Sequence, residues 1–396
     1  MELSRKYSAV SGSPTLIIDS KFKAMKADGI DVVGFGAGEP DFDTPRHIKD
    51  AAIEAINTGF TKYTPASGII ELKKAIVDKF ERENGLSYAT NQIVVSNGAK
   101  HSLINTFGAI LNPGDEVILP APFWVSYIEM IKLSDGTPVV VNCPEENNFK
   151  LRPEELENAI TPKTKALVLN SPSNPTGMVY TKDELRAIAE ICVKHNIFVV
   201  SDEIYEHLIY EGERCSIASF GDDIKNLTII INGLSKTYAM TGWRIGYLAC
   251  APEIAKIIGN VQSHETSNPN SIAQYAAVTA LNAGLDFVDD MKAEYMMRRD
   301  YMVEHINAID GVSCLKPQGA FYVMMNIKNL LGKEFCGCKI ESSMDFADAL
   351  LSKALVALVP GEGFACPGYL RWSYATSSYN IKRGIERLQK FLNNEY

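Results

Sequence analysis

Residues 232–247 place two cations where an α/β protein would bind a ligand. This segment holds Lys236 and Arg244 and follows the apolar run 227–231, which predicts a buried strand. In an open α/β sheet, ligands bind at the carboxyl ends of the strands. A lysine at that edge can bind a phosphate or, when its pKa is lowered, form a Schiff base. A single lysine in a loop is more simply interpreted as a solvated surface charge. Whether Lys236 binds a ligand therefore depends on the residues at the other strand ends.

Two further predicted strand ends carry groups that could bind a ligand. Gly98, Ala99 and Lys100 follow the strand predicted at 92–96 and open a helix, so their backbone N–H groups could hold a phosphate. The same residues would also fit an ordinary helix start in which Asn97 is the N-cap and no ligand is bound. Trp124 follows the strand predicted at 116–119, where its flat ring belongs either at the ligand edge or in the core.

An amide, a carboxylate and a phenol follow the next strands. Asn174 lies in a proline-stiffened loop after the strand predicted at 165–170, and Asp202 and Tyr205 follow the apolar run 197–201. An unpaired buried carboxylate is costly, so Asp202 predicts a cationic partner at this edge.

The elements that position these residues alternate between strand and helix. Strands are predicted at 92–96, 116–119, 138–142, 165–170, 197–201, 228–231 and 246–250, and helices at 98–111, 124–133, 153–159 and 182–195. The alternation predicts an α/β fold with a mainly parallel, seven-stranded, doubly wound sheet.

Both chain ends are predicted to form a smaller α+β domain. Helices are predicted at 19–28, 287–309, 343–354 and 381–392, and strands at 356–360 and 369–374. The predicted large domain spans 46–290, and the small domain combines 1–45 with 291–396.

The glycine-rich run 34–38 resembles part of a dinucleotide-binding fingerprint. That motif needs a helix directly after the glycines, whereas Pro40 and Pro45 predict a loop, so a Rossmann site is excluded. The glycines instead predict a close approach of the backbone to a ligand. Thr44 as N-cap and Pro45 at the first helical position predict a helix reaching residue 57.

Composition narrows the function classes. The 396 residues suffice for two domains, and the net charge of −9 argues against a nucleic-acid partner. No apolar run approaches the length of a membrane span, and the N-terminus lacks a signal-peptide core. The 8 scattered cysteines predict reduced thiols in a cytoplasmic protein, and neither the Cys336 and Cys338 pair nor the 6 histidines have the spacing of a metal site.

An anion seat, an aromatic ring, a carboxylate, an amide, a phenol and a lysine at one edge match the groups of pyridoxal 5′-phosphate (PLP). The chain resembles the class I aminotransferases, which are fold-type I PLP enzymes, and within them the bacterial aspartate aminotransferases. The resemblance covers nearly the whole chain and is carried by the motifs at 38–45, 63–65, 122–124, 170–177, 201–205, 235–246 and 371–376.

This resemblance implies roles for the residues that would surround the PLP ring. Lys236 would bind the cofactor as a Schiff base and act as general base at the substrate Cα. Asp202 would keep the pyridine nitrogen protonated, and Asn174 and Tyr205 would hydrogen-bond the 3-oxygen. Trp124 would stack on the ring.

The resemblance also implies a phosphate site and a homodimer with shared active sites. The phosphate would lie on the backbone of Gly98, Ala99 and Lys100, with Ser235 and Arg244 as further donors. Tyr63 would reach the phosphate from the partner subunit. Position 233 is glycine where many relatives carry a phosphate-binding serine.

Substrate binding is implied for a third group of residues. Arg371 would hold the α-carboxylate bidentately beside the Gly38 backbone. The region 261–270 lacks the arginine with which animal-type enzymes bind the side-chain carboxylate, so Lys100 would take that role or neutralise the phosphate alone. The implied substrate residues are Thr15, Gly38, Lys100, Trp124, Asn174 and Arg371.

The implied reaction transfers the amino group of L-aspartate to 2-oxoglutarate and gives oxaloacetate and L-glutamate. A class I aminotransferase with another donor preference (aromatic, alanine or prephenate-directed) would share every cofactor residue. A PLP-dependent carbon–sulfur β-lyase would use the same scaffold. A PLP-sensing regulator would need a DNA-binding domain, and no basic helix-turn-helix pattern precedes the sheet.

Overall fold

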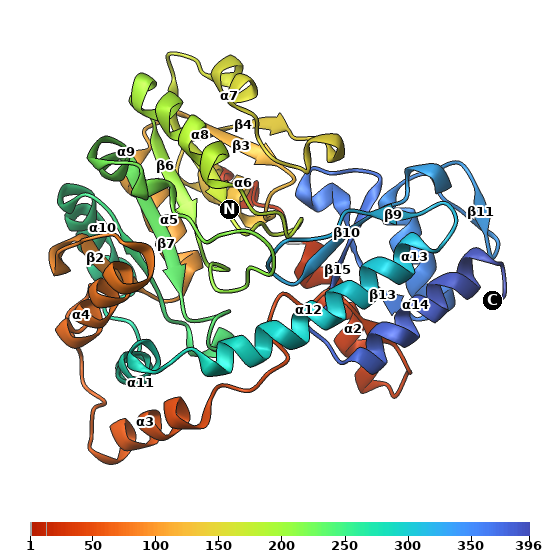
Figure 1. Ribbon diagram of the computed structural model, residues 1–396, viewed down its shortest axis with the longest axis horizontal. Coiled ribbons are helices and arrows are strands. Elements are labelled where there is room, and N and C mark those ends of the chain that lie inside the picture. Colours follow the sequence, from red (N-terminus) through yellow and green to blue (C-terminus); the bar gives the residue numbers. More distant parts are fainter. Residues whose placement is uncertain (1, 13) are drawn as a thin grey trace.

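The computed structural model describes residues 2–12 and 14–396 and is built around one large sheet (Figure 1). Its seven strands lie in the order β2-β8-β7-β6-β5-β3-β4. They are β2 (Ile93–Ser96), β3 (Glu116–Ala121), β4 (Thr137–Asn142), β5 (Thr164–Asn170), β6 (Phe198–Asp202), β7 (Thr228–Gly233) and β8 (Gly246–Ala249). Only β8 is antiparallel to its neighbours, β2 and β7. The predicted mainly parallel, seven-stranded α/β sheet is confirmed.

Helices cover both faces of this sheet, as its apolar strands require. One face packs on α5 (Ala99–Ile110), α6 (Ser126–Leu133) and α10 (Pro252–Glu265), and the other on α7 (Pro153–Ala159), α8 (Lys182–His195) and α9 (Asp222–Leu227). Along β5, Val168 contacts the first group, while Leu167 and Leu169 contact the second. A third cluster packs α4 (Ile70–Lys79), α3 (Arg46–Asn57) and α11 (Ser271–Asn282) against the β2 side.

A second, antiparallel sheet has the order β14-β15-β10-β9. It comprises β9 (Ser313–Cys314), β10 (Tyr322–Asn326), β14 (Val359–Pro360) and β15 (Tyr369–Ser373). The helices α12 (Asp286–Asn307), α13 (Ser343–Ala354) and α14 (Ser378–Leu392) pack with it. β1 (Val33–Gly34) pairs with β13 (Val356–Ala357), and α2 (Pro14–Ala27) packs beside this pair, so segments from both halves of the chain share this part of the molecule (Figure 1).

The remaining described elements are short. They are α1 (Arg5–Ser8), β11 (Glu334–Phe335), β12 (Cys338–Lys339) and the helical turns η1 (Phe80–Asn84), η2 (Thr90–Gln92), η3 (Glu145–Asn147), η4 (Ile217–Ser219), η5 (Thr241–Trp243), η6 (Lys328–Leu330) and η7 (Gly361–Phe364). None of the described helices is long and apolar enough to cross a membrane.

The start of α3 differs from the prediction. Pro45 occupies the N-cap position, and Thr44 does not cap the helix. The Thr44 hydroxyl instead donates to the Ala239 carbonyl at 2.6 Å and accepts from the Trp243 indole at 3.0 Å. These bonds tie the loop before α3 to the segment that carries Lys236, an attachment that no local pattern could reveal.

Candidate active site

The strand ends singled out above meet at one cavity of about 210 Å³. The chain leaves β5, β6 and β7 at this edge, and α5 begins there, while β10 and β15 of the second sheet form the opposite wall. The cavity is lined by Gly38, Ala99, Lys100, Leu103, Trp124, Tyr127, Asn170, Asn174, Asp202, Ile204, Tyr205, Ser235, Lys236, Thr241, Arg244, Tyr322 and Arg371.

Three of the implied site residues are not part of this lining. Gly98 lies directly behind it as the N-cap of α5. Tyr63 is 92% exposed on the single chain. The side chain of Thr15 lies outside the part of the chain that the structure describes.

The N-terminus of α5 and Arg244 form a seat for an anion. Gly98 has φ 86°, and a Cβ at this position would overlap the Arg244 guanidinium. A Cβ at Gly246 would overlap the backbone of Ala99, so strand β8 approaches the helix start closely. The first N–H groups of a helix and its dipole favour an anion. Arg244 donates to the Thr241 carbonyl at 2.8 Å and has no carboxylate partner among the described residues, so this seat fits the PLP phosphate.

Lys236 projects into the cavity, where its ammonium donates to the Gly38 carbonyl. Its Nζ also lies 5.9 Å from the Tyr205 ring centroid. Burial lowers the pKa of Lys236 to about 8, with Arg371 and Arg244 acting in the same direction against Glu39. A lysine with this pKa has a neutral fraction near pH 7, which both Schiff-base formation and proton abstraction need.

The lowered pKa of Lys236 predicts a stability effect in the cofactor-free protein. Folded Lys236 titrates near pH 8 and the unfolded side chain near its ordinary 10.5, so between these values the unfolded chain binds more protons. The free energy of unfolding therefore gains a contribution as pH rises through this window. The free energy of unfolding in urea is measured for the parent and for Lys236→Met. The difference between the two values should be constant below pH 8 and should shift in favour of the parent above pH 8. Parallel curves from pH 7 to 11 would contradict this expectation.

Asp202 ends β6 and faces the cavity from a buried position. It accepts from the Tyr127 hydroxyl at 2.7 Å and from the Ile204 N–H at 3.2 Å. Burial raises the pKa of Asp202 to about 6, and the Tyr127 hydrogen bond opposes this shift only in part. Asp202 forms no ion pair with the described residues, and a protonated pyridine nitrogen would supply a cationic partner.

Two asparagines fix the loop beside Asp202. The Asn170 amide donates to the Asp202 carbonyl at 2.9 Å, and its oxygen accepts from the Asn174 N–H at 2.7 Å. On the other side, the Tyr205 and Tyr322 hydroxyls lie 2.9 Å apart. Burial and Tyr322 raise the pKa of Tyr205, so its hydroxyl keeps a proton that it can donate to an anionic oxygen.

Arg371 is a buried cation prepared for a carboxylate. Its Nη1 donates to the Asn174 side chain and its Nη2 to the Gly36 carbonyl, both at 2.9 Å, while Nε has no hydrogen-bond partner among the described residues. The guanidinium lies 4.4 Å over the Tyr322 ring. Burial lowers the pKa of Arg371, and no described carboxylate pairs with it. A buried charge of this kind requires an anionic partner, and a substrate carboxylate would supply one.

Lys100 is exposed at the mouth of the same cavity, with its ammonium 4.8 Å from the Trp124 ring centroid. Desolvation by the surrounding protein lowers the pKa of Lys100, and the positive charge of Arg244 lowers it further. No described carboxylate pairs with this ammonium, so it is available to an anion in the cavity.

Sequence reasoning missed three lining residues that shape the site. Tyr127 lies one helical turn after Trp124, and Asn170 is the last residue of a predicted strand, so both positions gave a local signal. Tyr322 gave none, because it belongs to the second sheet and reaches the cavity only through the packing of the two sheets.

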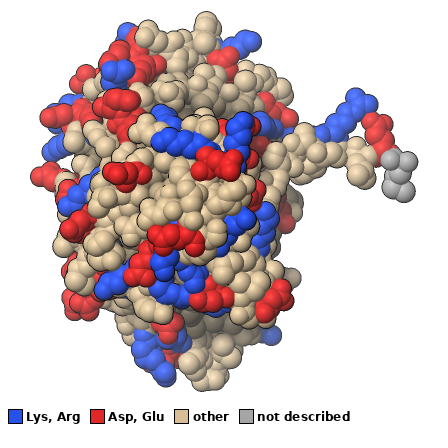
Figure 2. Space-filling model, turned by 90° about the vertical axis from the view of Figure 1, so that its right-hand side faces the viewer, with Lys and Arg blue, Asp and Glu red and all other residues tan. Residues whose placement is uncertain are grey.

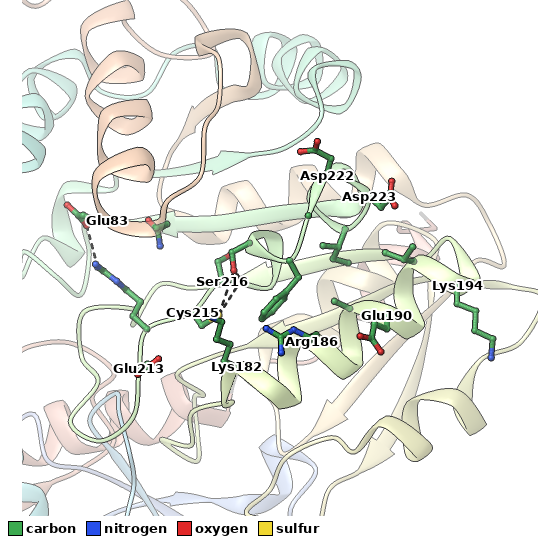
Figure 3. Close-up of a pocket in the computed structure, with 18 residues that line it drawn as sticks. Glu83, Lys182, Arg186, Glu190, Lys194, Glu213, Cys215, Ser216, Asp222 and Asp223 are labelled. Carbon is green, nitrogen blue, oxygen red and sulfur yellow. Dashed lines mark hydrogen bonds and ion pairs between the residues drawn. The ribbon is translucent and has the colours of Figure 1, made fainter.

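A larger cavity of about 920 Å³ opens between α8, α9 and η1. Figure 3 shows side chains of both charges around it, including Lys182, Glu190 and Asp222, that extend in different directions. Charged side chains that point in different directions line this wide groove, so its polar groups do not converge on one point. It therefore lacks the character of a catalytic site.

The comparisons agree with the chemistry of the smaller cavity. The model of the family "Aminotransferase class I and II" matches residues 30–388. The chain is 50% identical over 393 residues to the aspartate aminotransferase of Bacillus subtilis, covering 99% of both chains. It is 44% identical to the aspartate/prephenate aminotransferase of Nitrosomonas europaea, covering 99% of this chain and 100% of that one.

Among solved structures, the aspartate aminotransferase from Thermus thermophilus with maleate superposes with a TM-score of 0.94 and 44% identity. The superposition covers 99% of this chain and 100% of that one. The anion seat, the buried Asp202 and the Lys236 amine also fit the phosphate, the ring nitrogen and the aldehyde of PLP. The chain therefore belongs to the class I and II aminotransferases and is a PLP-dependent enzyme with the fold-type I architecture.

Proposed function

We propose that this enzyme transfers the amino group of L-aspartate to 2-oxoglutarate, giving oxaloacetate and L-glutamate. The charge of the cavity carries the proposal. Lys100, Arg244 and Arg371 line it without carboxylate partners among the described residues, and Asp202 is the single acidic residue of its lining. The PLP phosphate accounts for Arg244, and the substrate α-carboxylate accounts for Arg371. A second substrate carboxylate matches Lys100.

The position of each side chain in the cavity supports its proposed role. When bound, PLP withdraws electrons from the substrate Cα–H bond. As a neutral amine, Lys236 would take the proton from the substrate Cα and would then deliver a proton to the cofactor. Asp202 holds a proton on the pyridine nitrogen, and Arg371 orients the α-carboxylate beside the Gly38 backbone.

The remaining lining residues support these steps. Asn174 and Tyr205 would hydrogen-bond the cofactor 3-oxygen, and Trp124 would exclude water from the cofactor. Ala99 and Ser235, together with Gly98 behind the lining, would hold the phosphate with Arg244.

The names of the relatives support a dicarboxylate substrate. The Bacillus subtilis relative is an aspartate aminotransferase, and the Thermus thermophilus structure contains maleate, which also carries two carboxylates. The Nitrosomonas europaea relative adds prephenate. Prephenate has two carboxylates as well, so the same pair of cations makes it the second candidate as amino acceptor.

A coupled assay tests the function. The purified enzyme with PLP should form oxaloacetate from L-aspartate only when 2-oxoglutarate is added. A β-lyase would instead release pyruvate and ammonia from a single amino acid without any oxoacid. Ammonia release in the absence of an acceptor would overturn the proposal.

The role of Lys100 predicts a change in substrate preference. Lys100→Met should lower kcat/KM for L-aspartate by about 10- to 100-fold, because a charge-assisted hydrogen bond to the side-chain carboxylate is lost. Turnover of L-alanine and L-phenylalanine should change little, and Lys100→Arg should keep most of the aspartate activity. Equal losses for all three substrates would show that Lys100 only neutralises the phosphate.

We also propose a homodimer in which Tyr63 reaches the phosphate of the partner subunit. Its 92% exposure on one chain supports this, as does the exposure of the apolar Ile53 and Ile56 on α3. Figure 2 shows that the exposed N-terminal segment projects from the body of the molecule, which supports a contact with another chain.

Three further proposals concern the domains, the compartment and the class of ligand. Residues 46–290 form the large domain, and 1–45 with 291–396 form the small one, because the two sheets have separate apolar clusters. The enzyme acts in the cytoplasm, which its 8 free cysteines support. Lys and Arg are interspersed with Asp and Glu on the face in Figure 2, which favours small substrates over nucleic acid.

A further inference from the structure

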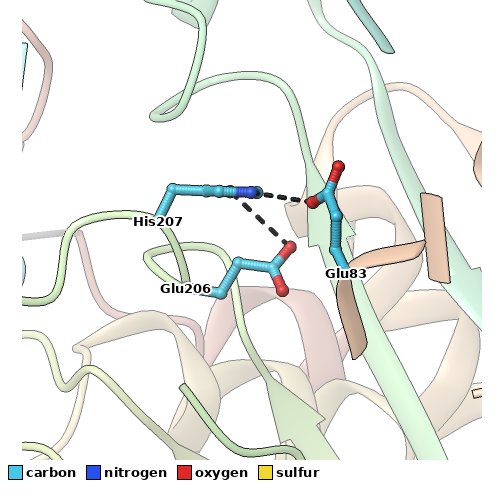
Figure 4. Close-up of side chains that lie close together, drawn as sticks. All are labelled: Glu83, Glu206 and His207. Carbon is cyan, nitrogen blue, oxygen red and sulfur yellow. Dashed lines mark hydrogen bonds and ion pairs between the residues drawn. The ribbon is translucent and has the colours of Figure 1, made fainter. Parts of the chain in front are cut away.

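A charge cluster of Lys79, Glu83, Glu206 and His207 lies behind the wall of the active site. Figure 4 shows Glu83, Glu206 and His207 pointing toward one another. One side-chain nitrogen or oxygen atom of each lies within 4.8 Å of those of the other two. His207 Nε2 lies 2.8 Å from Glu83, and Nδ1 lies 3.8 Å from Glu206. Such a set could hold a metal ion. However, Lys79 forms an ion pair with Glu206 and lies 3.9 Å from Glu83, so the chain supplies its own cation.

Lys79 is held firmly in this cluster. It is the last residue of α4 and is 1% exposed. Its ammonium also donates to the Asn84 side chain at 2.9 Å, and the Asn84 amide donates to Glu206 at 2.9 Å. Although burial opposes it, Lys79 and then His207 hold the pKa of Glu206 well below its usual range, so the carboxylate is charged. Lys79 and Glu206 therefore form a true buried ion pair.

The cluster contacts the segment 202–207 from behind. Asp202 and Tyr205 of this segment line the cavity, whereas Glu206 and His207 turn away from it into the cluster. Because these residues follow one another in the turn after β6, fixing Glu206 also fixes the backbone that carries Asp202 and Tyr205.

The same cluster contacts the segment 232–237, which carries Lys236. The Asn232 amide donates to Glu206 at 2.6 Å, and the Thr237 hydroxyl lies 3.2 Å from His207 Nδ1. Thr237 is the neighbour of Lys236 in the chain. One buried carboxylate thus connects the segment of the general base with the segment of the ring-nitrogen carboxylate.

We propose that Lys79 is a positioning residue that, through Glu206 and His207, holds the segments of Lys236 and Asp202 at a fixed separation. Stability alone does not require this arrangement, because apolar residues of similar volume can replace a buried ion pair without loss. Alignment of the reacting groups does require it, since a displacement of about 1 Å can cost about 100-fold in rate. The proposal rests on the proposed roles of Lys236 and Asp202 and not on the choice of substrate.

Lys79→Met, with Lys150→Met as the matched control, tests the proposal in the PLP-loaded enzyme. Lys150 is also buried and ion-paired, with Glu184 at 2.6 Å, but it touches neither segment. Lys79→Met should lower kcat by about 10- to 100-fold, with KM for L-aspartate close to the parent value. It should also move the pH midpoint of the visible absorbance of the bound cofactor. Lys150→Met should leave kcat and the midpoint unchanged.

A double variant separates positioning from stability. Lys79→Met combined with Glu206→Met removes both charges, so the melting temperature of the cofactor-free protein should recover relative to Lys79→Met while kcat stays low. Recovery of kcat together with the melting temperature would overturn the proposal, as would a parent-like kcat and midpoint in Lys79→Met.

If Lys79→Met does not fold, Thr237→Val provides the same test, because it removes one hydroxyl contact with His207. It should lower kcat by about 3- to 10-fold and move the absorbance midpoint. An unchanged kcat and midpoint in this variant would overturn the proposal. A parent enzyme without a visible cofactor band would instead contradict the proposed role of Lys236, so the two failures are distinguishable.

Discussion

Lys236→Ala is expected to lower kcat by about 10⁴-fold, because the same side chain binds the cofactor and moves the Cα proton. Lys100, the other lysine of the described lining, has its ammonium over the Trp124 ring, whereas the Lys236 ammonium reaches the Gly38 carbonyl. The measurement is steady-state turnover of L-aspartate and 2-oxoglutarate with saturating PLP. A small primary amine in the buffer should restore part of the rate, since it supplies the missing base.

Lys73→Ala is the matched control for this variant. Burial lowers the pKa of Lys73 as well, but Lys73 hydrogen-bonds Ser67 and is not part of the cavity lining. Its loss should leave kcat near the parent value. If Lys236→Ala and Lys73→Ala gave similar turnover, the catalytic role of Lys236 would be wrong.

Asp202→Asn is expected to lower kcat by about 10³-fold, the cost of leaving one charge of a buried pair without its partner. The amide keeps the volume of the side chain but cannot hold a proton on the pyridine nitrogen. The enzyme should still bind PLP, because the phosphate seat around Gly98 and Arg244 is unchanged. Turnover and the visible spectrum of the variant are measured together.

Tyr127→Phe provides the comparison for Asp202→Asn. It removes the hydroxyl that donates to Asp202 at 2.7 Å and leaves the carboxylate in place. A loss of only about 3- to 10-fold is expected, the usual contribution of one neutral hydrogen bond. A larger loss of kcat in Tyr127→Phe than in Asp202→Asn would mean that the Tyr127 hydroxyl, rather than the Asp202 charge, serves the reaction.

The regular elements were predictable wherever local chemistry defines them. The bounds of α7, α8 and α13 agree with the prediction because their caps are local. In α8, Thr181 and Glu184 form a capping box, and Asn196 ends the helix with φ 52°. The strands of the large sheet were equally visible. Most of them are buried and form continuous apolar runs, and the edge strand β4, which is only partly buried, still contains three consecutive valines.

The missing parts of the site depend on contacts between distant segments. Tyr322 and Arg371 share one wall of the cavity because β10 pairs with β15, and only the motif around Arg371 gave a signal. The cluster around Lys79 was also missed, since Lys79 falls on a regular helix and its partner Glu206 lies 127 residues away. Periodicity along the chain carries no information about such a pairing.

One spectrum tests the central claim, that PLP bound through Lys236 exchanges amino groups with a dicarboxylic amino acid. The purified protein is mixed with PLP, and its visible absorbance is followed while L-aspartate alone is added. The account predicts that the cofactor band fades as L-aspartate is added and returns when 2-oxoglutarate follows. A band that L-aspartate leaves unchanged, in protein that has taken up PLP, would contradict the account.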